Sequence, residues 1–243
     1  MSRAAAPATG LELRDISAGY AGAQVLRSVS LVAPAGHVTA LIGGNGAGKT
    51  TLLNVASGLH RPTSGAVVLD GRDVTRCRPA ERVQLGICHI PEGRAIFPSL
   101  TVRENLQLHD RDAVEDVVGT AIEAFPALGQ RLDQVAGSMS GGQQQMLALA
   151  RAYVSGPNYI LLDEVSMGLA PALVAEIFEF LEKLARGGAG LLVVEQYVSK
   201  VLDIADVVYV LRKGQVVFAG APDELDAEAL AESYVGSSAS RKA

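Results

Sequence analysis

The fold class of this chain is decided by one stretch, Gly43-Gly44-Asn45-Gly46-Ala47-Gly48-Lys49-Thr50-Thr51. It matches the pattern G-x-x-x-x-G-K-[ST] of a phosphate-binding loop. It follows an apolar run at residues 38–42 and precedes a helical pattern, which is where such a loop must lie. Glycines let successive backbone N–H groups point at phosphate oxygens, and the start of the next helix adds a partial positive charge. The sequence therefore predicts a site for a nucleoside triphosphate.

Two residues of this stretch bring specific chemistry. Lys49 adds a full positive charge on a flexible stem, and we expect it to reach the β- and γ-phosphates. The Thr50 hydroxyl is placed to ligate Mg²⁺. We assign all nine residues of the stretch, including the glycines, Asn45, Ala47 and Thr51, to nucleotide binding.

A pair of carboxylates supports this site. Asp163 and Glu164 end an apolar strand pattern at residues 159–162. Taken alone, such a pair is more often a solvated strand end, but beside a phosphate loop it is what a nucleotide enzyme needs. We expect Asp163 to hold Mg²⁺, directly or through water. Adjacent residues leave a strand in different directions, so Glu164 can instead accept a proton from the attacking water.

Composition limits the class of protein. The 243 residues carry a formal net charge of −5 and no block of Lys or Arg, which disfavours binding to DNA or RNA backbones. The longest apolar runs have the length of a strand, far below the roughly 20 residues that span a bilayer. Cys77 and Cys88 show no C-x-x-C pairing, which favours buried thiols over a disulfide or zinc site. The first residues have no signal-peptide pattern, and we expect a cytoplasmic protein.

Strand-like and helix-like patterns alternate along the chain. An antiparallel opening is predicted at residues 11–17 and 25–32. Later strands are predicted at 38–42, 67–69, 86–90, 159–162 and 191–194, and helices at about 48–59, 101–134, 143–153 and 171–186. This order is βαβ patterning, so the sequence predicts an α/β fold with a mainly parallel sheet.

A second anion-binding surface is predicted at Ser140-Gly141-Gly142-Gln143, where glycines lead into a helix. One ATP does not need two such surfaces from one chain. In this order along the chain, the phosphate loop, this segment and the Asp163-Glu164 pair resemble the motifs of ATP-binding-cassette (ABC) ATPases. In that family two nucleotide domains dimerise head to tail, and each signature segment covers the ATP held by the other domain. The resemblance implies that residues 140–143 contact ATP.

The resemblance covers almost the whole chain and adds three residues. Tyr20 matches the aromatic residue that stacks on adenine, although from the residue alone a partly buried strand position is equally plausible. Glu92 stands where most ABC ATPases carry a Gln that senses Mg²⁺ and the attacking water. Gln196 stands where most carry a His that touches the γ-phosphate. The resemblance thus implies catalytic roles for Glu92 and Gln196, and a metal role for Glu92.

Several further segments look like the second ATPase subunit of branched-chain amino-acid importers, and importers of urea and short amides are similar. These segments are residues 91–94, 96–98, 100–102, 104–106, 168–171 and 194–196. Val165 replaces the Pro usual after the catalytic Glu, and the loop that follows lacks the usual Asp, so communication between the two ATP sites is expected to differ. Glu195 is interpreted as a cap of its strand end.

The resemblance implies an α/β P-loop NTPase of the ABC type. It has a mainly parallel core sheet, an antiparallel β portion and an inserted helical subdomain at about 93–142. We expect one domain over residues 10–235, with disordered tails at 1–9 and 236–243. The loop residues Phe97 and Pro98 are expected to line the groove that receives a short helix of a membrane subunit, with local packing as the alternative.

The implied function is ATP hydrolysis with Mg²⁺ that drives import of branched-chain or other hydrophobic amino acids. The implied partners are a paralogous ATPase, with a homodimer as the alternative, two permease subunits and, indirectly, a solute-binding protein; nucleic acid is not expected. The chain would then lie at the inner face of the cell membrane. Three alternatives stay open: import of urea or short amides, a weakly hydrolysing regulatory subunit, and a non-transport ABC ATPase.

Overall fold

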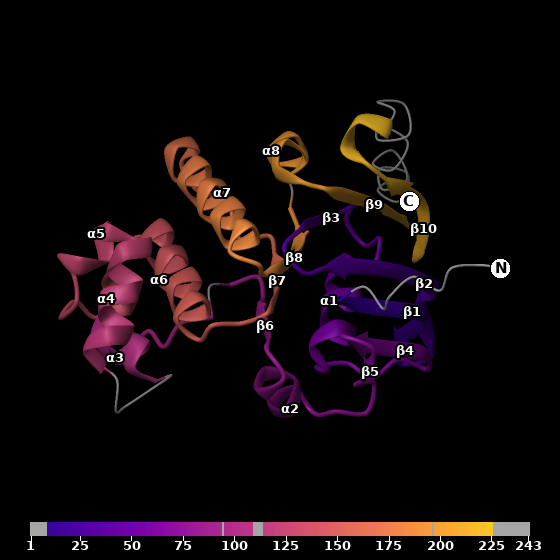
Figure 1. Cartoon of the computed structure of the whole chain (residues 1–243), viewed down its shortest axis with the longest axis horizontal. Coiled ribbons are helices and arrows are strands. Elements are labelled where there is room, and N and C mark those ends of the chain that lie inside the picture. The colour runs from indigo at the N-terminus through magenta and orange to yellow at the C-terminus, as the bar shows by residue number, and fades with distance from the viewer. Residues whose placement is uncertain (1–8, 94, 109–113, 196, 226–243) are drawn as a thin grey trace, which may run out of the picture.

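The computed structural model describes residues 9–93, 95–108, 114–195 and 197–225, and these form two sheets with helices around them (Figure 1). The first sheet is antiparallel and has the strand order β2-β1-β4-β5. Its strands are β1 (Gly10–Tyr20), β2 (Ala23–Pro34), β4 (Ser64–Leu69) and β5 (Arg72–Asp73). It confirms the predicted antiparallel opening, and the strands are a few residues longer than predicted.

The second sheet is mainly parallel and has the order β10-β9-β3-β8-β7-β6. Its strands are β3 (Val38–Ile42), β6 (Ile87–Ile90), β7 (Tyr159–Asp163), β8 (Gly190–Val194), β9 (Val207–Arg212) and β10 (Gln215–Gly220). The first five run parallel to their neighbours, and β10 joins β9 as an antiparallel edge. The predicted α/β fold with a mainly parallel core sheet is confirmed.

The central strands separate two hydrophobic cores, because alternate residues of a strand point to opposite faces of a sheet. In β8, Leu191 and Val193 face the core shared with the helices, whereas Leu192 and Val194 face the core shared with the antiparallel sheet. Both faces are covered, so β3, β7 and β8 consist of buried residues only. This is the burial typical of parallel strands, and it fixes the strand ends that carry the site.

The helices lie on either side of this sheet (Figure 1). Four of them, α3 (Val102–Gln107), α4 (Val114–Ala124), α5 (Pro126–Gly129) and α6 (Gly141–Val154), pack together at one end of the molecule. The others are α1 (Lys49–Ser57), α2 (Pro79–Gln84), α7 (Pro171–Arg186) and α8 (Val198–Ile204). The subdomain boundary at about 93–142 stays a proposal, and α6, which packs against α3 and α4, extends beyond it.

The helical prediction for residues 101–134 was wrong as one continuous stretch. Thr101 does begin a helix, because its hydroxyl accepts a hydrogen bond from the Glu104 amide at 3.1 Å. The end of the stretch, however, folds back onto the start of α3: the Arg103 amide donates to the Leu132 carbonyl at 2.9 Å, and Thr101 forms a β-bridge with Val135. A helical pattern shows which residues face a core but not that the chain has reversed direction between them.

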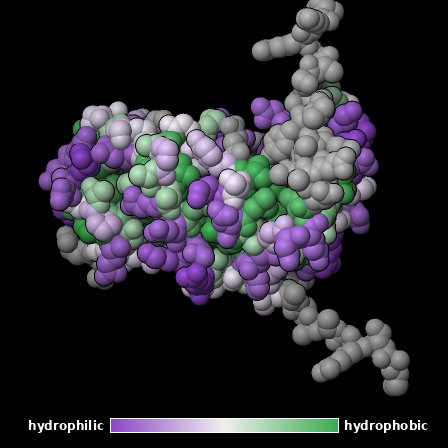
Figure 2. Space-filling view, turned by 90° about the horizontal axis from the view of Figure 1, so that it is seen from above, coloured by the Kyte–Doolittle hydropathy of each residue, from purple (hydrophilic) through white to green (hydrophobic). Residues whose placement is uncertain are grey.

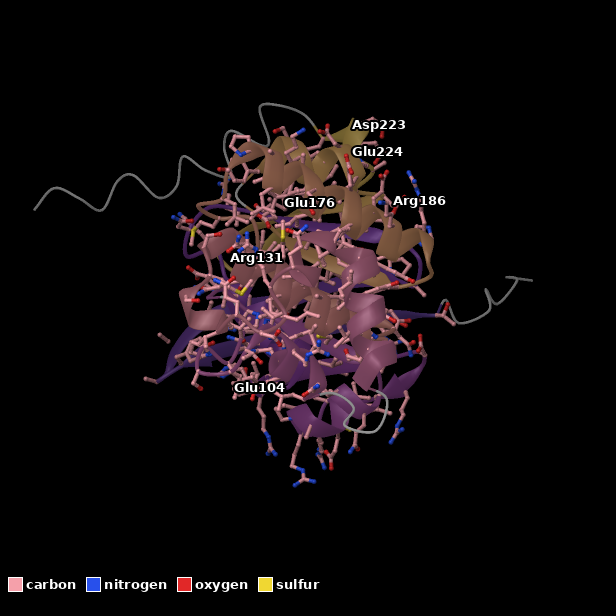
Figure 3. All side chains as sticks on the ribbon, turned by 90° about the vertical axis from the view of Figure 1, so that its left-hand side faces the viewer. Glu104, Arg131, Glu176, Arg186, Asp223 and Glu224 are labelled. Atoms are coloured by element: carbon pink, nitrogen blue, oxygen red, sulfur yellow. The ribbon has the colours of Figure 1, made fainter. Side chains whose placement is uncertain are left out.

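The surface views show what the fold presents to its surroundings. Figure 2 shows a hydrophobic area among hydrophilic side chains on the face seen from above. Figure 3 shows charged side chains of both signs, among them Glu104, Arg131, Glu176 and Arg186, spread over the helical end. No helix in the described residues has the length and apolar character that crossing a membrane requires.

Candidate functional site

The phosphate loop lies between the buried strand β3 and α1, as predicted. Gly43 has a φ of 157°, and a Cβ there would lie 2.2 Å from the Leu211 carbonyl oxygen. Gly48 has a φ of 111° at the N-cap of α1. A side chain at either position would be strained, so the sequence allows this tight approach only because it has glycine there. The Gly214 amide donates to the Ala47 carbonyl at 3.0 Å and ties the loop to the β9–β10 hairpin.

Lys49 is folded back over this loop. Its Nζ donates to the carbonyl oxygens of Gly43 at 2.8 Å and Gly44 at 3.3 Å, and the residue is 8% exposed. Burial lowers the pKa of Lys49, and the charges of Glu164 and Asp163 oppose that shift. A cation is therefore held at the mouth of the loop, next to two carboxylates.

Asp163 is a buried carboxylate. It ends β7, it is 1% exposed, and both oxygens are shielded from solvent and have no partner in good hydrogen-bond geometry among the described residues. Burial, the largest cause, raises its pKa; Glu164 and Glu92 raise it further, whereas the nearby Thr50 hydroxyl and Lys49 lower it. A desolvated carboxylate is costly unless a cation or donors compensate it, and among the described residues Lys49 and Thr50 are the groups that do so.

These residues fit Mg²⁺. The donor set of Asp163, Thr50 and Glu92 consists of oxygens, which Mg²⁺ prefers, and the uncompensated oxygens of Asp163 would be satisfied by a cation. In the described part of the chain, no group of three or more His, Cys, Asp or Glu side chains is gathered as a metal site. Mg²⁺ in nucleotide sites commonly takes one or two protein ligands and completes its shell with water and phosphate oxygens.

Glu164 follows in an unusual backbone conformation. Its φ is 50°, and its amide donates to the Val194 carbonyl at 2.8 Å. With Glu92, Gln145 and Met167 it lines a cavity of about 400 Å³. The structure thus brings together Lys49, Thr50, Glu92, Asp163 and Glu164, which we call the phosphate-loop site. Gln196, the remaining predicted catalytic residue, lies outside the described residues.

The segment 140–143, called the signature segment, has a different structure. Ser140 caps α6: its hydroxyl accepts a hydrogen bond from the Gln143 amide at 3.4 Å, and its own amide donates to the Gln143 side-chain oxygen at 3.0 Å. A Cβ on Gly142 would lie 2.0 Å from Cδ2 of Leu173, so glycine allows α6 to pack against the start of α7. No hydrogen bond in the described residues joins the signature segment to the phosphate loop.

Tyr20 stands at the end of β1 and is 47% exposed. Its ring lies 4.4 Å from the ring of His60, centroid to centroid, at 34°. Tyr20 is thus a partly buried strand residue, as the alternative expected, and an aromatic face is also left accessible at the surface; stacking on adenine stays a prediction.

Two features were missed or misread in the sequence. Glu195 does not merely cap a strand end: it accepts hydrogen bonds from the amide and hydroxyl of Ser166, at 2.9 and 2.5 Å. Its only signal was a carboxylate directly after an apolar strand, which gives no hint of a distant partner. Arg151 was not singled out either. Its guanidinium donates to the Ala95 carbonyl and lies 4.9 Å from the centroid of the Phe97 ring.

A phosphate loop between a buried parallel strand and a helix, with carboxylates at the end of another strand of the same sheet, defines a P-loop nucleoside triphosphatase. A sequence model of the family described as ABC transporter matches residues 26–167. Among similar proteins is the high-affinity branched-chain amino acid transport ATP-binding protein BraG of Pseudomonas aeruginosa. It is 40% identical over 211 residues, which cover 85% of this chain and 91% of that protein.

Two further relatives agree. The probable branched-chain amino acid transport ATP-binding protein LivF of Archaeoglobus fulgidus is 38% identical over 215 residues, covering 86% of this chain and 91% of its own. The ADP conformation of MJ1267, an ATP-binding cassette of an ABC transporter, superposes with a TM-score of 0.80 at 28% identity, covering 93% and 98%. The chain belongs to the ABC transporter family and is an ATP-hydrolysing, nucleotide-binding subunit of such a transporter. The predicted family and activity are confirmed.

Proposed function

We propose that this subunit drives import of branched-chain or other hydrophobic amino acids. The support is its likeness, at 40% and 38% identity over most of the chain, to two proteins named for branched-chain amino acid transport. The unusual Glu92 and Gln196 accompany the segments that resemble such importers. Importers of urea and short amides share these segments, so the preference for amino acids rests on the two named relatives.

In the proposed site, residues 43–51 cradle the phosphates of ATP and Tyr20 stacks on adenine. Thr50, Asp163 and Glu92 would hold Mg²⁺, which when bound would neutralise charge on the phosphate oxygens. Lys49 would exchange its contacts with the Gly43 and Gly44 carbonyls for contacts with the β- and γ-phosphates. The ammonium is already positioned at the mouth of the loop, so little reorganisation is needed.

Glu164 is the proposed general base. Its carboxylate accepts a proton from water as the water oxygen attacks the γ-phosphorus, and the bond from that phosphorus to the bridging oxygen of ADP breaks. Gln196 would hydrogen-bond the γ-phosphate but, unlike His, carries neither a proton nor a positive charge at neutral pH. This ATP site would then be the slower of two.

The second site would belong to a paralogous ATPase. Ser140, Gly141, Gly142 and Gln143 would cover the ATP bound by that partner, whose own signature would cover the ATP bound here. The support is the separation of the two regions within this chain: the signature segment begins α6, which packs with α3 and α4 at the helical end, whereas the phosphate loop begins α1 beside the antiparallel sheet (Figure 1).

Attachment to the membrane would come through two permease subunits, which place this chain at the inner face of the membrane. The proposed docking groove is a cavity of about 230 Å³ lined by His89, Ala95, Arg151 and neighbouring residues. Phe97 and Pro98, which were expected to line the groove, are not among its lining residues, but the Phe97 ring lies against the Arg151 guanidinium. Phe97 is 48% exposed, which supports a role as a contact surface.

The observation that carries this proposal is the likeness of the chain, at 40% and 38% identity, to two branched-chain amino acid transport ATP-binding proteins. The test is the ATPase rate of the purified intact transporter, reconstituted in vesicles with its solute-binding protein, in the presence of leucine, isoleucine, valine, urea or acetamide. We expect stimulation by the three amino acids and none by the two small amides. Stimulation by urea or acetamide alone would contradict the proposed solute.

A further inference from the structure

Three hydrogen bonds between described residues join the loop after β7 to the end of β8. The loop after β7 contains Glu164 and Ser166; Val194 is the last residue of β8, and Glu195 follows it directly. The Glu164 amide donates to the Val194 carbonyl at 2.8 Å. The Ser166 amide donates to Oε1 of Glu195 at 2.9 Å, and the Ser166 hydroxyl donates to Oε2 at 2.5 Å. Each carboxylate oxygen of Glu195 thus accepts a bond from the same residue of the loop after β7.

This pair is fully inside the protein. Glu195 is 2% exposed and Ser166 is 0% exposed. Removing a carboxylate from water is costly, and charge-assisted hydrogen bonds of this length are the strong ones that offset it. A single backbone bond would suffice to cap a strand end. The second bond, to a buried hydroxyl, therefore indicates that the geometry of the loop at Ser166 is what this carboxylate fixes.

The loop needs to be fixed because Glu164 is strained. A φ of 50° is uncommon for a residue with a side chain, and such conformations persist only where the surroundings determine them. Glu164 is held on its amide side by Val194, and two residues later the chain is held by Glu195. Val165, and not a proline, follows Glu164, so no fixed proline φ restrains the chain directly after the strained residue.

Glu195 reaches the loop of Glu164 through Ser166. Both of its carboxylate oxygens accept hydrogen bonds from that residue, one from the backbone amide and one from the hydroxyl.

We propose that Glu195 is a positioning residue, which through Ser166 holds the loop of Glu164 in the conformation that hydrolysis requires. The inference rests on the proposed role of Glu164 as the general base. Displacing a reacting group by about 1 Å can cost roughly 100-fold in rate. The phosphate loop is not part of this link, so nucleotide binding should be spared.

The experiment compares Glu195→Ala, Glu195→Gln and Ser166→Ala in the full-length chain. The control is Val67→Ala, which removes a fully buried side chain from the antiparallel sheet and so lowers stability without touching either loop. Steady-state hydrolysis gives kcat and KM for ATP. Hydrogen exchange at the amides of residues 164–167 gives a readout that does not require activity.

We expect kcat of Glu195→Ala to fall roughly 30- to 100-fold with KM within about twofold of the wild-type value. Glu195→Gln, which can still bond the Ser166 amide, should retain more kcat than Glu195→Ala. Exchange at 164–167 should accelerate in Glu195→Ala and Ser166→Ala, and stay unchanged in Val67→Ala.

Three results would overturn the inference. They are kcat of Glu195→Ala within about twofold of wild type, equal kcat losses in Glu195→Ala and Glu195→Gln, and unchanged exchange at 164–167 in Glu195→Ala. Glu164→Gln, measured in parallel, separates the two proposals. If Glu164→Gln hydrolyses ATP normally, the proposed base is wrong; if it is inactive while Glu195→Ala is normal, only the positioning role is wrong.

Discussion

The phosphate loop and the signature segment are both glycine-rich starts of helices, yet their surroundings differ. At the phosphate-loop site, the buried Asp163 oxygens have no partner in good hydrogen-bond geometry among the described residues, and Glu164 has a strained backbone. At the signature segment, Ser140 and Gln143 satisfy each other's hydrogen-bonding groups in a capping box. The phosphate-loop site therefore has polar groups left for a ligand to satisfy, whereas the hydrogen-bonding groups of the capping box in the signature segment are satisfied within the segment.

This difference fits two separate roles for the two regions. A site that binds and hydrolyses a charged substrate holds its charged groups in place before the substrate binds, because preorganised groups need not rearrange during the reaction. The signature segment is proposed to close over a partner's ligand, and for that role it needs a rigid shape instead. Gly142 provides that shape, since it lets α6 pack directly against Leu173 of α7.

The largest expected effect concerns the base. Glu164→Gln keeps the size and hydrogen bonding of the side chain but cannot accept a proton from water. Hydrolysis should fall by roughly 10²- to 10⁴-fold while ATP still binds. Single-turnover hydrolysis and nucleotide binding check this, with Glu182→Gln as control because Glu182 pairs with Arg186 on the surface of α7. Near-normal turnover would remove Glu164 from the mechanism.

The next largest effect compares a substitution in the phosphate loop with a substitution in the signature segment. Lys49→Ala removes a charge-assisted contact worth about 1.5–3 kcal/mol, so ATP binding at this chain's own site should weaken by roughly 10- to 100-fold. Ser140→Arg places a bulky cation where the partner's ATP would lie. Because the site with Gln196 is proposed to be the slower one, Ser140→Arg should cost more turnover of the reconstituted complex than Lys49→Ala.

Gln196→His is the matched gain-of-function variant in this comparison, and it should raise turnover of the complex. Suppose instead that this chain alone forms a fully active homodimer, with both lesions equally harmful and Gln196→His without effect. The proposal that the two ATP sites of the complex hydrolyse at unequal rates would then be wrong.

A smaller effect concerns stability. Burial raises the pKa of Asp163, so the ionised carboxylate is a destabilising element of the folded chain at neutral pH. Asp163→Asn should therefore stabilise the nucleotide-free chain by about 0.5–2 kcal/mol, although it impairs hydrolysis. The folded chain binds this proton more tightly than the unfolded chain, so the advantage of Asn is present at neutral pH and lost as the pH falls through the raised pKa toward about 3.9.

Thermal unfolding between pH 4 and pH 8 measures this effect. Asp133→Asn is the control, because its side chain is 96% exposed and should show no such pH-dependent gain. A melting temperature of Asp163→Asn below that of the wild type at pH 8 would contradict the claim that the buried, ionised Asp163 destabilises the folded chain.

The smallest effect concerns adenine. Tyr20→Ala should weaken ATP binding by about 0.5–1.5 kcal/mol, whereas Tyr20→Phe or Tyr20→Trp keeps an aromatic face and should be nearly silent. Equilibrium titration with ATP checks this. Equal losses in all three variants would instead indicate a role for the hydroxyl, or for packing against His60.

Much of this architecture could be predicted because its signals are local. The bounds of β3 follow from an uninterrupted apolar run, and those of α7 follow from helical spacing. The phosphate loop is identified by its pattern of glycines followed by Lys and Thr. The proximity of Asp163 to Lys49 followed from the general placement of carboxylates at strand ends. The hairpin of β9 and β10 was not predicted, and neither was the chain reversal that brings Leu132 back to Arg103, because both depend on pairing between residues rather than on a local pattern.

The same reason explains why Glu195 was misread. Its partner, Ser166, is on a different loop, and only the parallel pairing of β7 with β8 brings the two together. A single sequence gives residue types and spacing. It does not show which buried carboxylate is satisfied by which distant hydroxyl.

The central claim is that the two regions of this chain serve two different ATP molecules. The most direct measurement is photolabelling of the reconstituted complex with 8-azido-ATP under vanadate trapping, with each labelled subunit resolved and quantified. We predict that Lys49→Ala abolishes labelling of this chain and spares the partner, whereas Ser140→Arg spares this chain and abolishes trapping on the partner. Loss of label from this chain alone in both variants would contradict the claim, because both regions would then act on the same ATP.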